Sequence, residues 1–208
     1  LGLSVSVAEN QSAVTTVSAI DADGDTVTYS LTGADAADLS ISSAGVITFN
    51  TAPDYETKSS YAVTINVGDG TSTTSQSLTI SVTNANESPS AVGLSATSIA
   101  ENAAGASVGT LSSTDLDSSD TFTYTLSGTD ASSFEVSGST LKLKDSVAAD
   151  YESQTSYAVT VTTTDAGGLT TSQAFAVSVT NVNESPTAVA LSATSIAENS
   201  AGVTVGNL

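Results

Sequence analysis

Short runs in which apolar and polar side chains alternate are the main pattern of this sequence. Valine, isoleucine, leucine, tyrosine and phenylalanine recur at every second position, with serine and threonine between them. This period of two is typical of β-strands with one buried face, and no run has the period of a helix. The alternation predicts strands at 3–7, 14–19, 27–31, 39–41, 46–49, 61–67 and 78–82, and again at 92–99, 107–111, 122–126, 134–136, 140–143, 157–163 and 175–179.

Turn-forming residues separate these predicted strands, as at Asp23-Gly24-Asp25 and Ala166-Gly167-Gly168. Two sets of seven short strands joined in this way predict an all-β fold of tandem Greek-key seven-stranded β-sandwiches of the immunoglobulin-like kind. Aromatic and aliphatic residues at strand positions usually pack inside such a fold. The core is therefore expected to include Tyr29, Phe49, Tyr61, Ile65, Tyr124, Leu143, Tyr157 and Val161.

The two sets of strands are copies of one unit. Residues 98–102 return as 195–199, and residues 84–89 return with one change as 181–186, each 97 positions later. A unit of roughly 100 residues can bury its own core, so the repeat predicts domains at 1–87 and 88–184 and a partial third at 185–208. The partial unit holds two predicted strands without partners. It is either a truncation or a segment that completes a neighbouring molecule by strand addition.

The amino-acid composition excludes several classes of binding partner and of active site. Twenty-two acidic and three basic residues give a formal charge of −19, which excludes nucleic acid and anionic lipid as partners and favours cations. Because histidine and cysteine are absent, the chain cannot form a histidine relay, a thiol nucleophile, a zinc site or a disulfide. We therefore expect no enzyme activity. No apolar run reaches the roughly 18 residues of a membrane span, so direct membrane insertion is not expected.

The acidic and amide residues recur with the repeat, and the strand order assigns them to the two poles of each sandwich. One pole of the first copy and the facing pole of the second are expected to gather seven carboxylates, with two linker asparagines beside them. Calcium takes six to eight oxygen ligands and is the cation that carboxylate and amide oxygens favour where histidine and cysteine are absent. The residues are Glu9, Asp54, Glu56, Asn84, Asn86, Glu87, Asp115, Asp117 and Asp165.

The order of these motifs resembles the cadherin family, in the divergent form found in large bacterial surface proteins. The similar elements are Ala8-Glu9-Asn10, Asp54-Tyr55-Glu56, Asn84–Pro89, Asp115-Leu116-Asp117 and Asp165. The resemblance implies two or three Ca²⁺ at each junction between repeats. It further implies a half-present site at Glu101, Asp150, Glu152, Asn181, Asn183 and Glu184, and ligands toward a preceding repeat at Asp21, Asp23 and Asp69.

The chain also departs from the family pattern. Its linker begins with Asn84 and is one residue shorter, which lowers the charge there, and the absence of tryptophan excludes the tryptophan-anchored strand exchange of animal cadherins. An EF-hand starting at Asp21 is excluded by Thr26 and Thr32, where that loop needs glycine and glutamate. Paired carboxylates are the residues of a glycoside hydrolase, but a small sandwich offers no cleft for a sugar.

These observations predict a calcium-binding structural segment of a large extracellular adhesin or surface filament, in which junction calcium stiffens the array for cell adhesion. The alternative is a calcium-dependent carbohydrate-binding module of a secreted protein. The expected partners are the adjacent repeats of the same chain. Homophilic or strand-exchanging neighbours and cell-surface glycans or proteins remain open.

Overall fold

The computed structural model describes residues 2–118 and 120–192 and, beyond them, residues 195, 198, 199, 201, 202 and 204. The chain divides into two compact units. The first unit comprises Leu1–Val92, Ser113–Thr123 and Thr163–Thr171, and the second comprises Gly93–Ser112, Tyr124–Thr162 and Ser172–Leu208. Over the described residues, no helix has the length and apolar character needed to cross a membrane.

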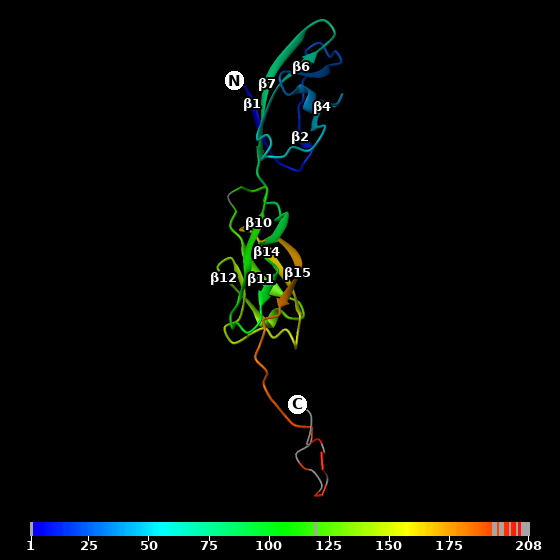
Figure 1. The fold of residues 1–208 in the computed structure, drawn as a ribbon. Coiled ribbons are helices and arrows are strands. Elements are labelled where there is room, and N and C mark those ends of the chain that lie inside the picture. The colour runs from blue at the N-terminus through cyan, green and yellow to red at the C-terminus, as the bar shows by residue number, and fades with distance from the viewer. Residues whose placement is uncertain are drawn as a thin grey trace. The chain divides into compact units, whose positions relative to one another are not determined.

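Two sheets form the first sandwich (Figure 1). One has the order β1-β7-β6-β3 and the other the order β2-β5-β4. The first strand runs parallel to β7, while β6 and β7 form a long antiparallel hairpin. The elements are β1 (Leu3–Ala8), β2 (Ala13–Thr16), β3 (Thr28–Thr32), the 3₁₀ turn η1 (Ala36–Asp38), β4 (Leu39–Ile41), β5 (Val46–Phe49), β6 (Ser60–Gly68) and β7 (Thr73–Thr83).

The core of the first sandwich is built by the alternation that the sequence shows. In the second half of β7 every second side chain, Leu78, Ile80 and Val82, is buried, and the residues between them are exposed serine and threonine. Ile47 of β5 enters the core from the opposite sheet. Phe49 and Tyr61 pack edge to face, with 4.9 Å between their ring centroids. Burial of these side chains holds the two sheets together.

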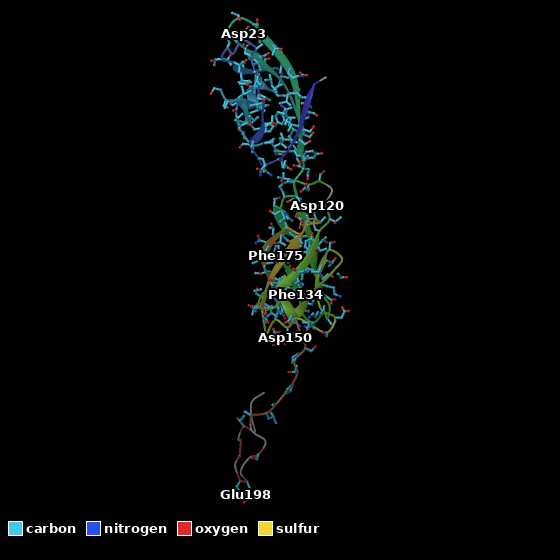
Figure 2. All side chains as sticks on the ribbon, turned by 180° about the vertical axis from the view of Figure 1, so that it is seen from behind. Asp23, Asp120, Phe134, Asp150, Phe175 and Glu198 are labelled. Carbon is cyan, nitrogen blue, oxygen red and sulfur yellow. The ribbon has the colours of Figure 1, made fainter. Side chains whose placement is uncertain are left out.

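The second sandwich repeats this plan with one additional strand. Its sheets have the orders β11-β14-β15-β9 and β12-β13-β10-β8. Phe134, which is labelled in Figure 2, packs edge to face on Tyr157 with 5.6 Å between the ring centroids. The elements are β8 (Ala91–Leu94), β9 (Ser98–Ala100), β10 (Ser107–Thr114), β11 (Thr123–Ser127), the 3₁₀ turn η2 (Ala131–Ser133), β12 (Phe134–Ser137), β13 (Thr140–Leu143), β14 (Ser156–Thr164) and β15 (Thr170–Thr180).

The all-β sandwich prediction is confirmed, with two differences in detail. The single strand predicted over 92–99 is wrong, because the chain breaks after Leu94 and its two halves join different sheets as β8 and β9. Tyr29 and Tyr124, expected in the core, are only half-buried. In the predicted third unit, residues 193, 194, 196, 197, 200, 203 and 205–208 lie outside the described residues, and the described segment 185–192 carries no strand.

Candidate metal centre

Glu9 is the most deeply buried acidic residue of the first unit, with 3% of its surface exposed. It follows β1 directly, where the parallel pairing with β7 ends. Its two carboxylate oxygens accept hydrogen bonds from the backbone N–H groups of Tyr55 and Ala85, both at 2.8 Å. These bonds tie the end of the first strand to the 54–56 loop and to the segment after β7.

Side-chain amides bridge the neighbouring carboxylates. The Asn84 amide nitrogen donates to Glu56 Oε1 at 2.6 Å and to Asp117 Oδ1 at 2.8 Å. The other oxygen of Asp117 accepts the backbone N–H of Glu87 at 3.0 Å. The segment that follows β7 therefore contacts carboxylates from two separate loops of the first unit.

Asp165 is held in the same way at the other side of this segment. It is 6% exposed, and its oxygens accept the Asn86 amide at 3.0 Å and the backbone N–H of Leu169 at 2.8 Å. Burial opposes ionisation of Asp165, but the hydrogen bond from Asn86 and those from backbone N–H groups outweigh it and lower its pKa. Asp165 is therefore ionised at neutral pH although it is buried.

Three carboxylate oxygens in this region are buried without a hydrogen-bond partner: Glu87 Oε2, Asp115 Oδ2 and Asp120 Oδ2. Their residues belong to two groups in which one oxygen of each residue lies within 4.8 Å of the others, Glu9 with Glu56 and Glu87, and Asp115 with Asp120 and Asp165. Each group thus brings together three oxygen ligands of the type that hard cations bind.

Burial and nearby negative charges change the pKa of two of these carboxyls. Burial raises the pKa of the Glu87 carboxyl, and the charge of Glu9 raises it further. Burial and the charge of Asp117 raise the pKa of Asp120 in the same direction. Without a cation, full ionisation of each set of three carboxylates therefore costs free energy.

The second unit repeats the first arrangement. Glu101 is 3% exposed and accepts the backbone N–H groups of Tyr151 at 2.8 Å and Val182 at 2.7 Å. It forms a third group with Asp150 and Glu152, again with oxygens within 4.8 Å of one another. Around this group Asn181 donates to Glu152 at 2.9 Å and Asn102 donates to Glu184 at 2.6 Å, while Asn183 bonds to the backbone oxygen of Glu184.

Other predicted ligands accept hydrogen bonds from residues of their own loops. Both oxygens of Asp54 accept hydrogen bonds from Thr57. Asp21 accepts the backbone N–H groups of Asp23 and Asp25, and Asp69 caps the loop that follows it. Asp21 and Asp69 line one hollow of about 240 Å³, but neither belongs to a carboxylate group among the described residues.

Two residues of the first unit that contribute to the site were not among the predicted ligands. Asp120, labelled in Figure 2, joins the group of Asp115 and Asp165. The sequence feature that could have identified Asp120 is the recurrence of Asp25-Thr26 as Asp120-Thr121. The loop that contains it is one residue longer in the second copy. Asn10 has a left-handed backbone with a φ of 60° and donates to Glu87 at 3.0 Å, and Asn102 repeats both features.

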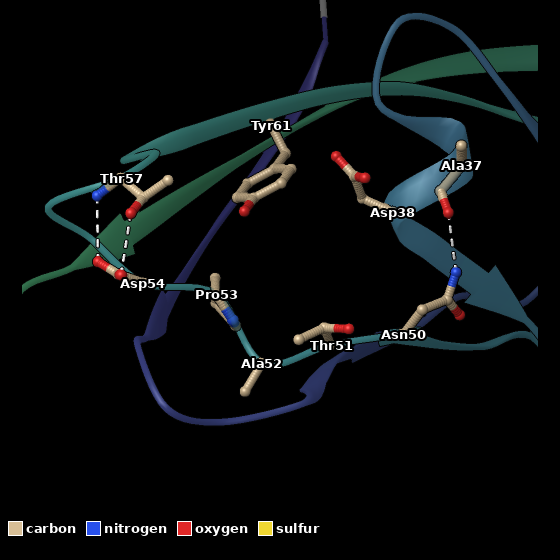
Figure 3. Close-up of a pocket in the computed structure, with 9 residues that line it drawn as sticks. All are labelled: Ala37, Asp38, Asn50, Thr51, Ala52, Pro53, Asp54, Thr57 and Tyr61. Carbon is tan, nitrogen blue, oxygen red and sulfur yellow. Dashed lines mark hydrogen bonds between the residues drawn. The ribbon is translucent and has the colours of Figure 1, made fainter.

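A hollow of about 340 Å³ lies beside Asp54 in the first sandwich (Figure 3). Tyr61 is the one aromatic residue among those that line it. It is 8% exposed, packs against Phe49 and has the Lys58 ammonium 4.2 Å from its ring centroid. Tyr61 therefore offers no free face to a sugar, and this hollow does not favour the carbohydrate-binding alternative.

Each half of the chain matches the family model of a known domain type. Residues 95–180 match the family model of the cadherin domain, and residues 2–83 match that of a bacterial Ig domain. No protein with a curated functional description matches the chain.

Several solved structures resemble the chain. PcdhgB3 EC1-4 has 25% identity and a TM-score of 0.67, over 87% of this chain and 48% of that one, so this chain spans about half its length. Human protocadherin-24 EC1-2 has 20% identity and a TM-score of 0.65, over 86% and 94%. Protocadherin gammaB7 EC3-6, described as a cis-dimer, has 24% identity and a TM-score of 0.61, over 88% and 46%.

Proposed function

We propose that this chain, which is built of cadherin-like tandem repeats, is a calcium-binding structural segment of an extracellular or cell-surface adhesin. Calcium would bind at the two carboxylate groups of the first unit and stiffen the connection between successive repeats. The proposal assigns a mechanical role and no catalysis.

The three partnerless buried oxygens are the observation that carries this proposal. A buried carboxylate oxygen without a donor costs free energy, on the order of 1–3 kcal/mol. Most buried carboxylate oxygens around them accept backbone or amide hydrogens, so these three are the buried oxygens that lack any partner and would gain most from a cation. Glu87, Asp115 and Asp120 thus supply at least one free oxygen to each group.

The proposed stiffening follows from the origin of the ligands. Glu9, Glu56 and Glu87 come from the first sequence repeat, whereas Asp115, Asp120 and Asp165 come from loops of the second. A cation that neutralises both sets removes their mutual repulsion and links segments that are distant in the chain. Extracellular calcium modules bind at about 10⁻⁴–10⁻³ M, so filling depends on the calcium concentration outside the cell.

Thermal unfolding in a calcium titration against chelator tests the proposal. At tenfold saturation each site adds about 1.4 kcal/mol of unfolding free energy. The variant Asp115→Ala with Asp117→Ala should lose this gain. Asp21→Ala with Asp23→Ala is the matched control, because it makes the same change at the corresponding loop of the first copy, outside the carboxylate groups.

The control variant should gain as much stability from millimolar calcium as the unchanged protein does. If calcium does not raise the melting temperature of the unchanged protein, the carboxylates are ordinary acidic surface and the proposal fails. Small-angle scattering tests the stiffening separately. Identical scattering with calcium and with chelator would leave calcium binding in place but remove its mechanical role.

A further inference from the structure

The side-chain amide of Asn86 lies directly against the backbone of Gly167. Both residues belong to the first compact unit. A Cβ placed on Gly167 would overlap Oδ1 and Cγ of Asn86 and would stand 2.6 Å from its Nδ2. Non-bonded heavy atoms pack at about 3.5–4.0 Å, so the observed position of this amide is open only while residue 167 is glycine.

The backbone at Gly167 gives no other reason for glycine. Its neighbour Gly168 has a φ of 92°, a left-handed conformation that favours glycine, but the φ of Gly167 is not positive. The backbone N–H groups of both residues donate to the Asp165 carboxylate, and any residue except proline could donate in the same way. A side chain at position 167 would therefore remove one thing, the space for Asn86.

This space lets Asn86 contact Asp165. The Asn86 amide nitrogen donates to Asp165 Oδ2 at 3.0 Å and to the backbone oxygen of Glu87 at 3.0 Å. Asp165 Oδ1 accepts the backbone N–H of Leu169 at 2.8 Å. Asp165 is 6% exposed and belongs to one of the carboxylate groups. The segment after β7 thus holds, through Asn86, a carboxylate that is also held by its own loop.

The same segment is anchored a second time at Pro89. Pro89 is fully buried, and its carbonyl oxygen accepts the hydroxyl of Thr171. Asn86 and Pro89 therefore both contact the stretch 165–171, which we call the linker seat. Within the linker seat, Gly167 is the position at which a side chain would displace the amide of Asn86.

The corresponding loop of the first copy is built differently. It runs from Asp69 to Ser72 and is one residue shorter than the loop from Asp165 to Leu169. It carries Thr71, whose N–H and hydroxyl donate to Asp69 Oδ1 at 2.6 Å and 2.8 Å. A threonine of the same loop thus contacts the aspartate in the first copy, and a linker asparagine contacts it in the second. The two copies therefore do not offer the same surface to an asparagine.

We propose that Gly167 is a positioning residue, which seats the Asn86 amide against Asp165 and so determines which linker side chain the second copy accepts. The linker seat takes an asparagine, and any side chain at position 167 would close it. Gly167 acts through Asn86 and Asp165. Because Asp165 is a calcium ligand in the proposed function, the effect of Gly167 on calcium binding rests on that function.

Urea unfolding in chelator tests the linker seat without calcium. A Cβ at position 167 would displace the end of a side chain and no backbone, so Gly167→Ala should cost what the contacts of Asn86 contribute. We expect the urea midpoints of Gly167→Ala and Asn86→Ala to fall by similar amounts, and that of the double variant to fall no further. Additive losses in the double variant would overturn the proposal.

Equilibrium dialysis with radioactive calcium measures the positioning role directly. Loss of a residue that orients a metal ligand weakens binding by about tenfold or more, so Gly167→Ala should bind calcium about tenfold more weakly. Gly138→Ala is the control for a general loss of stability. It changes a glycine with a φ of 62° outside the carboxylate groups, so it should lose stability and keep its calcium affinity.

The two experiments separate this inference from the proposed function. If the unchanged protein binds no calcium, the proposed function fails, and the urea midpoints still decide whether Asn86 needs glycine at position 167. If the unchanged protein binds calcium and Gly167→Ala binds it equally well, the proposed function stands and the positioning role is overturned.

Discussion

Replacing Glu9 by glutamine separates its role in folding from its role as a cation ligand. The carboxylate accepts the N–H groups of Tyr55 and Ala85, and glutamine keeps one oxygen for one of them. The other N–H then faces an NH₂ group, and the loss of a hydrogen bond to a charged acceptor costs about 1.5–3 kcal/mol. Removing one charge relieves repulsion of Glu87, so we expect a net loss of about 1–2 kcal/mol in chelator.

Calcium enlarges this loss if Glu9 is a ligand. A site at tenfold saturation adds about 1.4 kcal/mol, and a tenfold weaker site at the same calcium concentration adds about 0.4 kcal/mol. The variant should therefore lose about 1 kcal/mol more in calcium than in chelator. Urea unfolding at both conditions measures the difference.

The charge-matched control is Asp25→Asn, which removes one negative charge at an exposed position. Its loss of stability should not depend on calcium. An equal loss for Glu9→Gln with calcium and with chelator would refute the reasoning, because Glu9 would then be only an acceptor for the backbone.

Two further outcomes follow from the structure. Burial, as the largest cause, raises the pKa of both Glu87 and Glu152. In chelator the melting temperature should therefore rise as the pH falls from 7 toward the ordinary carboxyl pKa of 4.5. Calcium should remove this rise. A melting temperature that falls over the same pH range in chelator would contradict the prediction. Gly45→Ala should cost about 4 kcal/mol or more in urea unfolding, because its φ is 78° and the new Cβ would stand 2.1 Å from Val17 O. Gly138→Ala, at the corresponding turn with a φ of 62° and open space, should cost only about 1 kcal/mol, and equal costs would show that the close contact is not what matters.

The sequence predicted the strands well because one face of each strand is buried and the other is not. Leu78 and Ile80 alternate with exposed residues in β7, and that alternation is visible without a structure. It could not show the break between β8 and β9, since Val92 and Ile99 both point inward. A period of two identifies buried positions but does not say which of two sheets carries them.

The candidate ligands were identified because they recur in both copies of the repeat. Residues that do not recur at the same spacing were missed for the same reason. Glu9 and Glu101 stand out because each follows the same strand in its own copy. Asp120 was missed because its loop is one residue longer than the corresponding loop of the first copy. Asn10 was part of the motif Ala8-Glu9-Asn10, but its contact with Glu87 was not predicted because it depends on a left-handed backbone that a strand pattern does not reveal.

The asparagines suggest how one set of residues can serve the site with and without a cation. Here Asn84 and Asn86 turn their NH₂ groups toward Glu56, Asp117 and Asp165, so each amide supplies the partial positive charge that a cation would otherwise provide. An amide carries an oxygen on its other side, and amide oxygens are calcium ligands. On the calcium proposal, a rotation of each amide by half a turn would replace a hydrogen-bond donor with a ligand. An aspartate at position 84 could ligate a cation but could not donate hydrogen bonds to Glu56 and Asp117 when no cation is bound.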